Sequence, residues 1–278
     1  MRGTFVSGFM IAAAMAVLAA PAMAATGNAA AGAAQSLSPT PNPENPSHTY
    51  EVCLMTAKNE PEKGFEMAGK WLTLGGGAPA KHCEAIALIG MKEYSEAATR
   101  LEALAGLNEE ESVKAGVLSQ AGQAWLLQGD LTRALEAQTK ALEAMPVKNH
   151  QHAYILVDRA ATYADAGKYA EAVHDLDASL AIDAQNSDAL AFRASARRHL
   201  NEVDVALIDA EQAVAMDPHN VIGLLERGII YKMKNRDNDA RQDWLRIIQI
   251  APDSEAGKAA RTNIERLDVT VEAETKNK

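Results

Sequence analysis

Apolar and polar residues follow a helical period along most of the chain from residue 48 onward. Apolar side chains recur every three or four positions, the spacing that gathers them on one face of an α-helix. The helical segments are short, and Gly, Asn or Pro separates them. The pattern predicts an all-α fold over 48–268. It also predicts a polar tail over 269–278, which we expect to fray.

Four helix pairs in this region repeat one motif. A small residue marks the same place in each: Ala134, Ala172, Ala206 and Ala240. The last two intervals are 34 residues, and the first is 38 because four extra residues lie around Val147 to His150. A turn residue precedes each alanine: Gly129, Gly167, Asn201 and Asn235. In-phase recurrence of this kind predicts helix–turn–helix repeats over 112–254.

The first helix of these repeats adds small and aromatic residues at fixed places: Gly122 and Trp125, Ala160 and Tyr163, Gly228 and Tyr231. Two helices that cross closely need Ala or Gly where their backbones approach, with larger side chains beside them. On these residues the segment resembles the tetratricopeptide repeat family. The third repeat departs from the pattern, because Arg197 stands at the aromatic position.

The resemblance implies a right-handed α-solenoid of about six repeats. We expect two degenerate repeats over 48–107, four regular repeats over 112–254, and a capping helix over 255–268 that covers the open end of the stack. In the degenerate part, Pro61 to Trp71 predicts one second helix, and His82 to Leu101 predicts a helix pair.

The first residues have the pattern of an export signal. Arg2 precedes an apolar run over 5–20, and Ala22-Met23-Ala24 is the small-x-small pattern that a signal peptidase accepts. We expect a signal peptide over 1–24, cut after Ala24, and a periplasmic or secreted mature protein. An uncleaved membrane anchor stays open, although the run is short for a membrane span. The Ala- and Pro-rich stretch over 25–47 predicts a disordered tether.

The sequence contains two cysteines, Cys53 and Cys83. In an oxidising compartment such a pair favours one disulfide. Both fall at a similar level on predicted first helices, which lie side by side in a stacked array. A bridge would close a loop of about thirty residues and contribute roughly 3–4 kcal/mol in the chain-entropy model. Two unrelated buried thiols are the alternative.

Three repeats carry an arginine with an aspartate sixteen residues later: Arg159 and Asp175, Arg193 and Asp209, Arg227 and Asp243. The repeat before them has Ala121 and Ala137 at both places. A half-buried arginine without a partner is costly, so joint presence and joint loss predict structural ion pairs. Two unrelated, solvated charges are the alternative.

Composition and motifs narrow the function classes. The formal charge of −10 repels phosphate backbones, which argues against a nucleic-acid partner. No phosphate loop, nucleophile elbow or zinc-protease motif is present, so we expect no catalytic residue, no cofactor and no metal. His82 and Cys83 are adjacent on a helix and point about 100° apart, so they do not form a nucleophile and base. His150-x-His152 is left as a weak metal candidate.

Recognition of another protein or peptide is the function class that the sequence still allows. First helices line the concave side of a repeat stack, and the candidate partner groove there consists of Tyr154, Val157, Ala161, Asp188, Ala191, Ser195, His199, Ile222, Leu225, Ile229 and Lys232. Its mixed apolar and charged character suits a peptide or helix. The alternative is that these side chains only pack against neighbouring repeats. Family members that grip a C-terminal carboxylate use Lys and Asn in this groove, which this chain lacks at the matching places.

We therefore expect a non-enzymatic scaffold or adaptor for protein–protein interaction in the periplasm, without a stable membrane span after signal cleavage. A recognition subunit of a cell-envelope assembly or secretion complex is an alternative. A metal-dependent hydrolase with an unrecognised site is a remote one.

Overall fold

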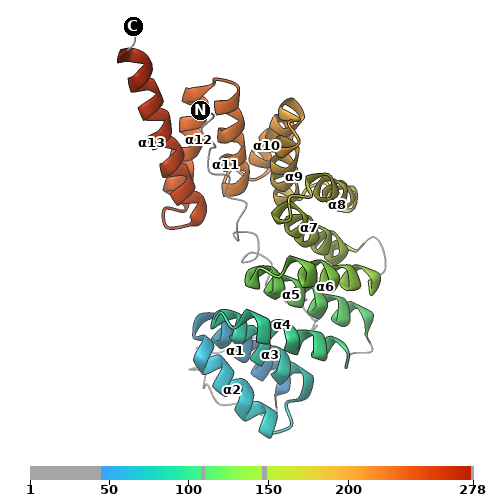
Figure 1. Cartoon of the computed structure of the whole chain (residues 1–278). Helices are drawn as coiled ribbons and strands as arrows, with labels where there is room; N and C mark the ends of the chain where they lie inside the picture. Colours follow the sequence, from blue (N-terminus) through green and yellow to red (C-terminus); the bar gives the residue numbers. More distant parts are fainter. Residues whose placement is uncertain (1–44, 108–109, 146–148, 277–278) are drawn as a thin grey trace, which may run out of the picture. The chain divides into compact units, whose positions relative to one another are not determined.

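The computed structural model describes residues 45–107, 110–145 and 149–276, and every regular element in these ranges is a helix (Figure 1). The predicted signal peptide over 1–24 and the tether up to residue 44 lie outside the described residues. None of the helices in the described ranges has the length and apolarity needed to cross a membrane. The helices form two compact units that divide after residue 146.

The N-terminal unit contains three helix pairs. They are α1 (Pro46–Asn59) with α2 (Pro61–Thr73), α3 (Gly77–Gly90) with α4 (Tyr94–Ala105), and α5 (Glu111–Gln128) with α6 (Leu131–Glu143). Each helix contacts the next, and α1 also contacts α3. The repeats expected to be degenerate are thus complete pairs. Helix α1 begins inside the predicted tether, because Pro46 occupies a first-turn position where its missing N–H is not needed.

The C-terminal unit contains three pairs and a final helix. They are α7 (His150–Asp165) with α8 (Tyr169–Ile182), α9 (Ser187–His199) with α10 (Val203–Met216), α11 (Val221–Met233) with α12 (Asp237–Ile250), and α13 (Glu255–Lys276). The first helices contact one another in order: α7 with α9, α9 with α11, and α11 with α13. Asparagine side chains cap α7, α9 and α11 by accepting backbone N–H groups.

The turn inside five of the pairs has one geometry. A residue with positive φ ends the first helix in each: Lys92, Gly129, Gly167, Asn201 and Asn235. The next backbone N–H bonds to the carbonyl oxygen five residues earlier, as in Arg236 to Tyr231 at 2.8 Å. This is the Schellman end of a helix, which favours Gly or Asn in the left-handed region. The sequence pattern found four of these turns and missed Lys92.

Close approach of the two helices explains the small residues. The four motif alanines, Ala134, Ala172, Ala206 and Ala240, are completely buried. A Cβ atom added at Gly228 would lie 2.5 Å from the Trp244 ring nitrogen, and one at Gly122 would lie 2.6 Å from Gln138. Larger side chains at these places would force the pair apart.

Helix α13 repeats the pattern of α11 with a change on one face. Where α11 has the buried residues Leu224 and Tyr231, α13 has Lys258 and Glu265, which are exposed. On its other face Ala260 and Leu267 are buried against α11 and α12. Helix α13 continues to Lys276, so the tail predicted over 269–278 is instead helical through that residue.

Candidate partner-binding surface

The eleven predicted groove residues do not form one open surface. Six of them are buried, with exposed fractions of 7% or less: Val157, Ala161, Ala191, Ser195, Leu225 and Ile229. Four of the six are members of apolar core clusters in the C-terminal unit: Val157, Ala191, Leu225 and Ile229. These six residues are therefore not part of an open surface in the described structure. Because the first helices pack side by side, these positions fill the contacts between repeats.

The other five groove residues reach the surface from three helices. Tyr154 of α7 is 45% exposed. Asp188 and His199 lie at opposite ends of α9 and are exposed, whereas Ile222 and Lys232 of α11 are half-buried. We call these five residues the open positions. They can contact a partner without opening the core.

Three of the open positions already have polar or ring contacts. Asp188 accepts a hydrogen bond from Asn220 at 2.7 Å, and partial burial of its carboxyl raises the pKa of this group. His199 stacks on Tyr169 with ring centroids 4.3 Å apart, and burial lowers the pKa of its imidazole. Lys232 donates to both carboxylate oxygens of Asp237 at 3.0 Å. Tyr154 and Ile222 contribute apolar surface, which a partner can cover.

The three Arg–Asp pairs each join the two helices of one repeat. Arg227 donates through Nε and Nη2 to the two oxygens of Asp243, at 2.8 and 2.6 Å. Arg159 and Asp175 pair in the same bidentate way at 2.7 and 2.9 Å, and so do Arg193 and Asp209 at 2.9 and 2.8 Å. The three aspartates are at most 5% exposed. These groups hold the helix pairs together, and the fork geometry explains why arginine occupies the place.

Arg197, the departure from the aromatic pattern, joins this charge network. Its Nη1 donates to Asp209 at 2.7 Å, so Asp209 serves two arginines. Arg193 also reaches Asp177 of the preceding repeat at 2.7 Å. In this repeat an arginine thus stands at the aromatic position, and it gives the buried Asp209 carboxylate a second cationic partner.

Sequence reasoning missed a second buried ion pair between α9 and α11. Arg198 donates to Glu226 at 2.7 Å, and the Ser195 hydroxyl donates to the same carboxylate at 2.8 Å. Glu226 is 3% exposed. The partners lie 28 residues apart and recur in no other repeat, so no periodic signal connects them.

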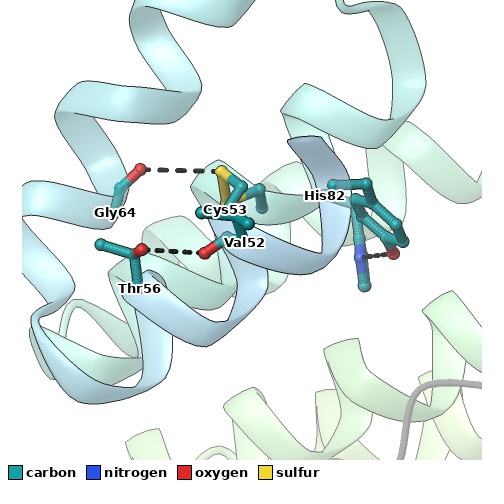
Figure 2. Close-up of a disulfide and its surroundings, with 7 residues drawn as sticks. Val52, Cys53, Thr56, Gly64 and His82 are labelled. Carbon is teal, nitrogen blue, oxygen red and sulfur yellow. Dashed lines mark hydrogen bonds between the residues drawn. A yellow bond between two sulfur atoms is a disulfide. The ribbon is translucent and has the colours of Figure 1, made fainter. Parts of the chain in front are cut away.

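Cys53 and Cys83 form a disulfide that joins α1 to α3 (Figure 2). Their Cα atoms are 6.0 Å apart, and both residues are completely buried beside Met67 and Trp71. The bridge connects two first helices of neighbouring repeats. It therefore links the first two pairs of the N-terminal unit covalently.

The histidine candidates, His150 and His152, lie at the start of α7. His150 lies 3.7 Å from the Asp183 carboxylate, and His152 lies in the first turn of α7. Within the described ranges, no group of three or more His, Cys, Asp or Glu side chains could hold a metal ion. His82 is buried and bonds to Tyr50 and Gln120 rather than to Cys83.

Comparison with known proteins identifies the type of fold. No protein-family model matches the chain. Mouse sperm-associated antigen 1 is 35% identical over 103 residues, which are 36% of this chain and 11% of the mouse protein. Bovine tetratricopeptide repeat protein 36 is 27% identical over 125 residues, 44% of this chain and 66% of the bovine protein.

The solved structure of Pseudomonas aeruginosa PilF matches with a TM-score of 0.62 at 15% sequence identity, and covers 79% of this chain and 98% of that chain. The chain has a tetratricopeptide-like, all-α solenoid fold, as the sequence predicts. The chain spans about a tenth of the mouse relative's length, so the likeness concerns the repeats and not a whole protein.

Proposed function

We propose that this chain is a non-enzymatic scaffold or adaptor that binds another protein or peptide outside the cytoplasm. The observation that carries the proposal is that, in the C-terminal unit, buried carboxylates are paired inside the structure while large apolar side chains are exposed. The buried carboxylates Asp175, Asp209, Asp243 and Glu226 are occupied in ion pairs that hold helices together. Large apolar side chains are exposed on the outside of the same helices.

Four such side chains lie on four different helices: Tyr154 on α7, Ile208 on α10, Met233 on α11 and Leu245 on α12. Their exposed fractions lie between 44% and 61%. Aromatic residues and methionine are enriched at protein interfaces, and rigid helices present them without a large entropic cost. The open positions add Asp188 and Lys232, which can orient a partner by charge.

Site-specific cross-linking in cells tests where a partner binds. We would place a photoreactive amino acid at Tyr154 or Ile222 and identify the captured peptides by mass spectrometry. His174 of α8 is the matched control, because its side chain is 84% exposed and it lies on a second helix of the same unit. We expect a discrete protein to be captured from 154 or 222 and not from 174. The same set of proteins from all three positions would contradict the proposal.

Export across a membrane is the second part of the proposal. Two observations support it: the signal-like residues 1–24 and the disulfide between Cys53 and Cys83, since disulfides persist in oxidising compartments. Cell fractionation with intact-mass measurement tests it. The expected product begins at Ala25, lies outside the cytoplasm, and has lost two hydrogens to the disulfide. A cytoplasmic chain with its first residues retained would contradict export.

A further inference from the structure

The exposed side of α12 carries a hollow of about 530 Å³, a volume typical of ligand-binding pockets, which span about 300–1,000 Å³. It is lined by five residues of α12 and by one residue of the connection before α11: Gln242, Leu245, Arg246, Gln249, Ile250 and His219. All six belong to the C-terminal unit, and all but Ile250 are exposed. We call this hollow the α12 pocket. Because it is open to solvent, it suits a peptide segment that lies along the helix.

Arg246 is the permanently charged group of the α12 pocket, and it has no ion pair or hydrogen bond in the part of the chain that the structure describes. Every other arginine in these ranges interacts with another group of the chain. The chain carries a formal charge of −10, yet none of its described carboxylates pairs with Arg246. A guanidinium presents its N–H donors in a planar fork that matches a carboxylate. The pocket therefore offers a free cation to an acidic group of a partner.

Two earlier repeats use the position of Leu245 to connect neighbouring repeats. The matching residues lie 34 positions apart, and they are acidic: Asp177 of α8 and Glu211 of α10. Asp177 accepts a hydrogen bond from Arg193 of α9 at 2.7 Å, and Glu211 accepts one from Tyr231 of α11 at 3.2 Å. Leucine cannot accept such a bond, and Leu245 is 46% exposed. The last repeat thus has an apolar side chain at the surface where these two repeats have an acidic link.

The other lining residues match the backbone and side chains of a peptide. Gln242, Arg246 and Gln249 are spaced by four and three residues, so they lie along one face of α12. Neither glutamine makes a hydrogen bond within the described ranges, and each side-chain amide can both donate and accept, as a peptide group does. Leu245 and Ile250 add apolar surface. A free anion would use the cation alone, whereas a peptide uses the amides and the apolar surface as well.

We infer that the α12 pocket binds an extended peptide segment in which an acidic residue stands next to an apolar one. The peptide carboxylate pairs with Arg246, its backbone bonds to the two glutamine amides, and its apolar side chain covers Leu245. The site goes beyond the proposed function, because it lies on a second helix and not at the open positions of α7, α9 and α11. One cation selects the acidic residue, so reversing its charge should reverse the preference.

Selection from a phage-displayed library of random short peptides, with the full chain as target, tests this chemistry. We expect the enriched sequences to carry Asp or Glu beside a large apolar residue. With Arg246→Glu as target, the enriched sequences should carry Lys or Arg instead. Lys140→Glu is the matched control, because Lys140 is an exposed cation at the corresponding position of α6 and should leave the selection unchanged. No enrichment on the wild-type chain, or the same sequences from wild type and Arg246→Glu, would overturn the inference.

Fluorescence anisotropy with one enriched peptide gives the size of the effect. Arg246→Ala should weaken binding by about two- to fivefold, as for an exposed ion pair. Arg246→Glu should weaken it by about tenfold or more, because it adds repulsion, and Leu245→Ser should also weaken it. Equal weakening in Lys140→Glu would show a general effect of charge and would contradict a site at α12, as would a change in oligomeric state that Arg246→Glu alone causes, since the pocket would then contact a second copy. Failure to capture a protein from position 154 or 222 would refute the proposed function and leave this result standing.

Discussion

Removing the carboxylate of one buried Arg–Asp pair is the sharpest test of how the repeats are held together. In Asp243→Ala the Arg227 guanidinium loses both of its acceptors at 2.6 and 2.8 Å. The Arg227 side chain is only 20% exposed, so water restores part of its solvation and not all. Breaking a buried pair costs roughly 3–5 kcal/mol, and this exposure places the expected loss near the lower end, about 3 kcal/mol.

The double variant Arg227→Ala with Asp243→Ala should cost much less than the sum of the single losses. It creates the alanine pair that the repeat of α5 and α6 already has, as Ala121 and Ala137, both buried. The exposed pair Arg236 and Asp239, with side chains 44% and 41% exposed, is the control in the same repeat. Its coupling energy should be much smaller than that of Arg227 and Asp243, because water screens exposed ion pairs.

Urea unfolding of chains labelled with fluorotryptophan measures the free energy of unfolding of the C-terminal unit, which contains Arg227 and Asp243. The protein has three tryptophans, and Trp244 is the one that lies in the C-terminal unit, next to Asp243. Its ¹⁹F resonance therefore reports on that unit alone. If the losses in Arg227→Ala and Asp243→Ala add to within about 0.5 kcal/mol of the double loss, the pair is not coupled and the reasoning is refuted.

Three other predictions follow from packing, cross-linking and charge. Gly228→Ala forces a methyl group to 2.5 Å from Trp244 and should cost about 1–3 kcal/mol by urea unfolding, whereas Gly69→Ala, with open space around it, should stabilise by roughly 0.5–1 kcal/mol. Cys53→Ser should destabilise the N-terminal unit by roughly 2–5 kcal/mol; an unchanged urea midpoint would show that the bridge does not form in the purified chain. Asp165 is an exposed residue whose carboxyl is partly buried, and this partial burial raises its pKa to about 6; its ionisation therefore opposes folding above that pH, and stability is regained as the pH falls from 6 towards 3.8. Asp165→Asn should therefore raise Tm at pH 7.5 and leave it unchanged at pH 4; a lower Tm at pH 7.5 would show that the carboxylate has a favourable partner.

The sequence was sufficient for the elements and their pairing because both depend on local pattern. Small residues such as Ala206 and Gly228 mark helix crossings, and Asn201 marks a left-handed turn, whatever lies elsewhere in the chain. The Arg–Asp spacing of sixteen is fixed by the turn, so it also could be found from the sequence. Lys92 was missed because lysine is an unusual residue at positive φ.

The partner surface could be predicted only in part, because it depends on how closely neighbouring first helices pack. The period placed Ala191 and Tyr154 on one side of their helices, yet Ala191 is buried and Tyr154 is 45% exposed. The difference comes from the contact of α7 with α9 and of α9 with α11, which no local pattern specifies. The bonds of His82 were out of reach for a similar reason, since its partners lie 32 and 38 residues away.

The face of α13 that carries the exposed residues Lys258 and Glu265 affects how copies of the chain can meet in concentrated solution. Two copies that met end to end there would have to strip water from Lys258, Arg261 and Glu265, all exposed. Lys258 is already paired with Glu255, and Arg261 donates to the Pro252 carbonyl oxygen, so neither cation lacks an acceptor. Desolvating these charges is unfavourable in free energy unless the incoming surface supplies matching charges. Repeat arrays with apolar ends can polymerise into fibres, and we expect these charged side chains of α13 to disfavour such a contact.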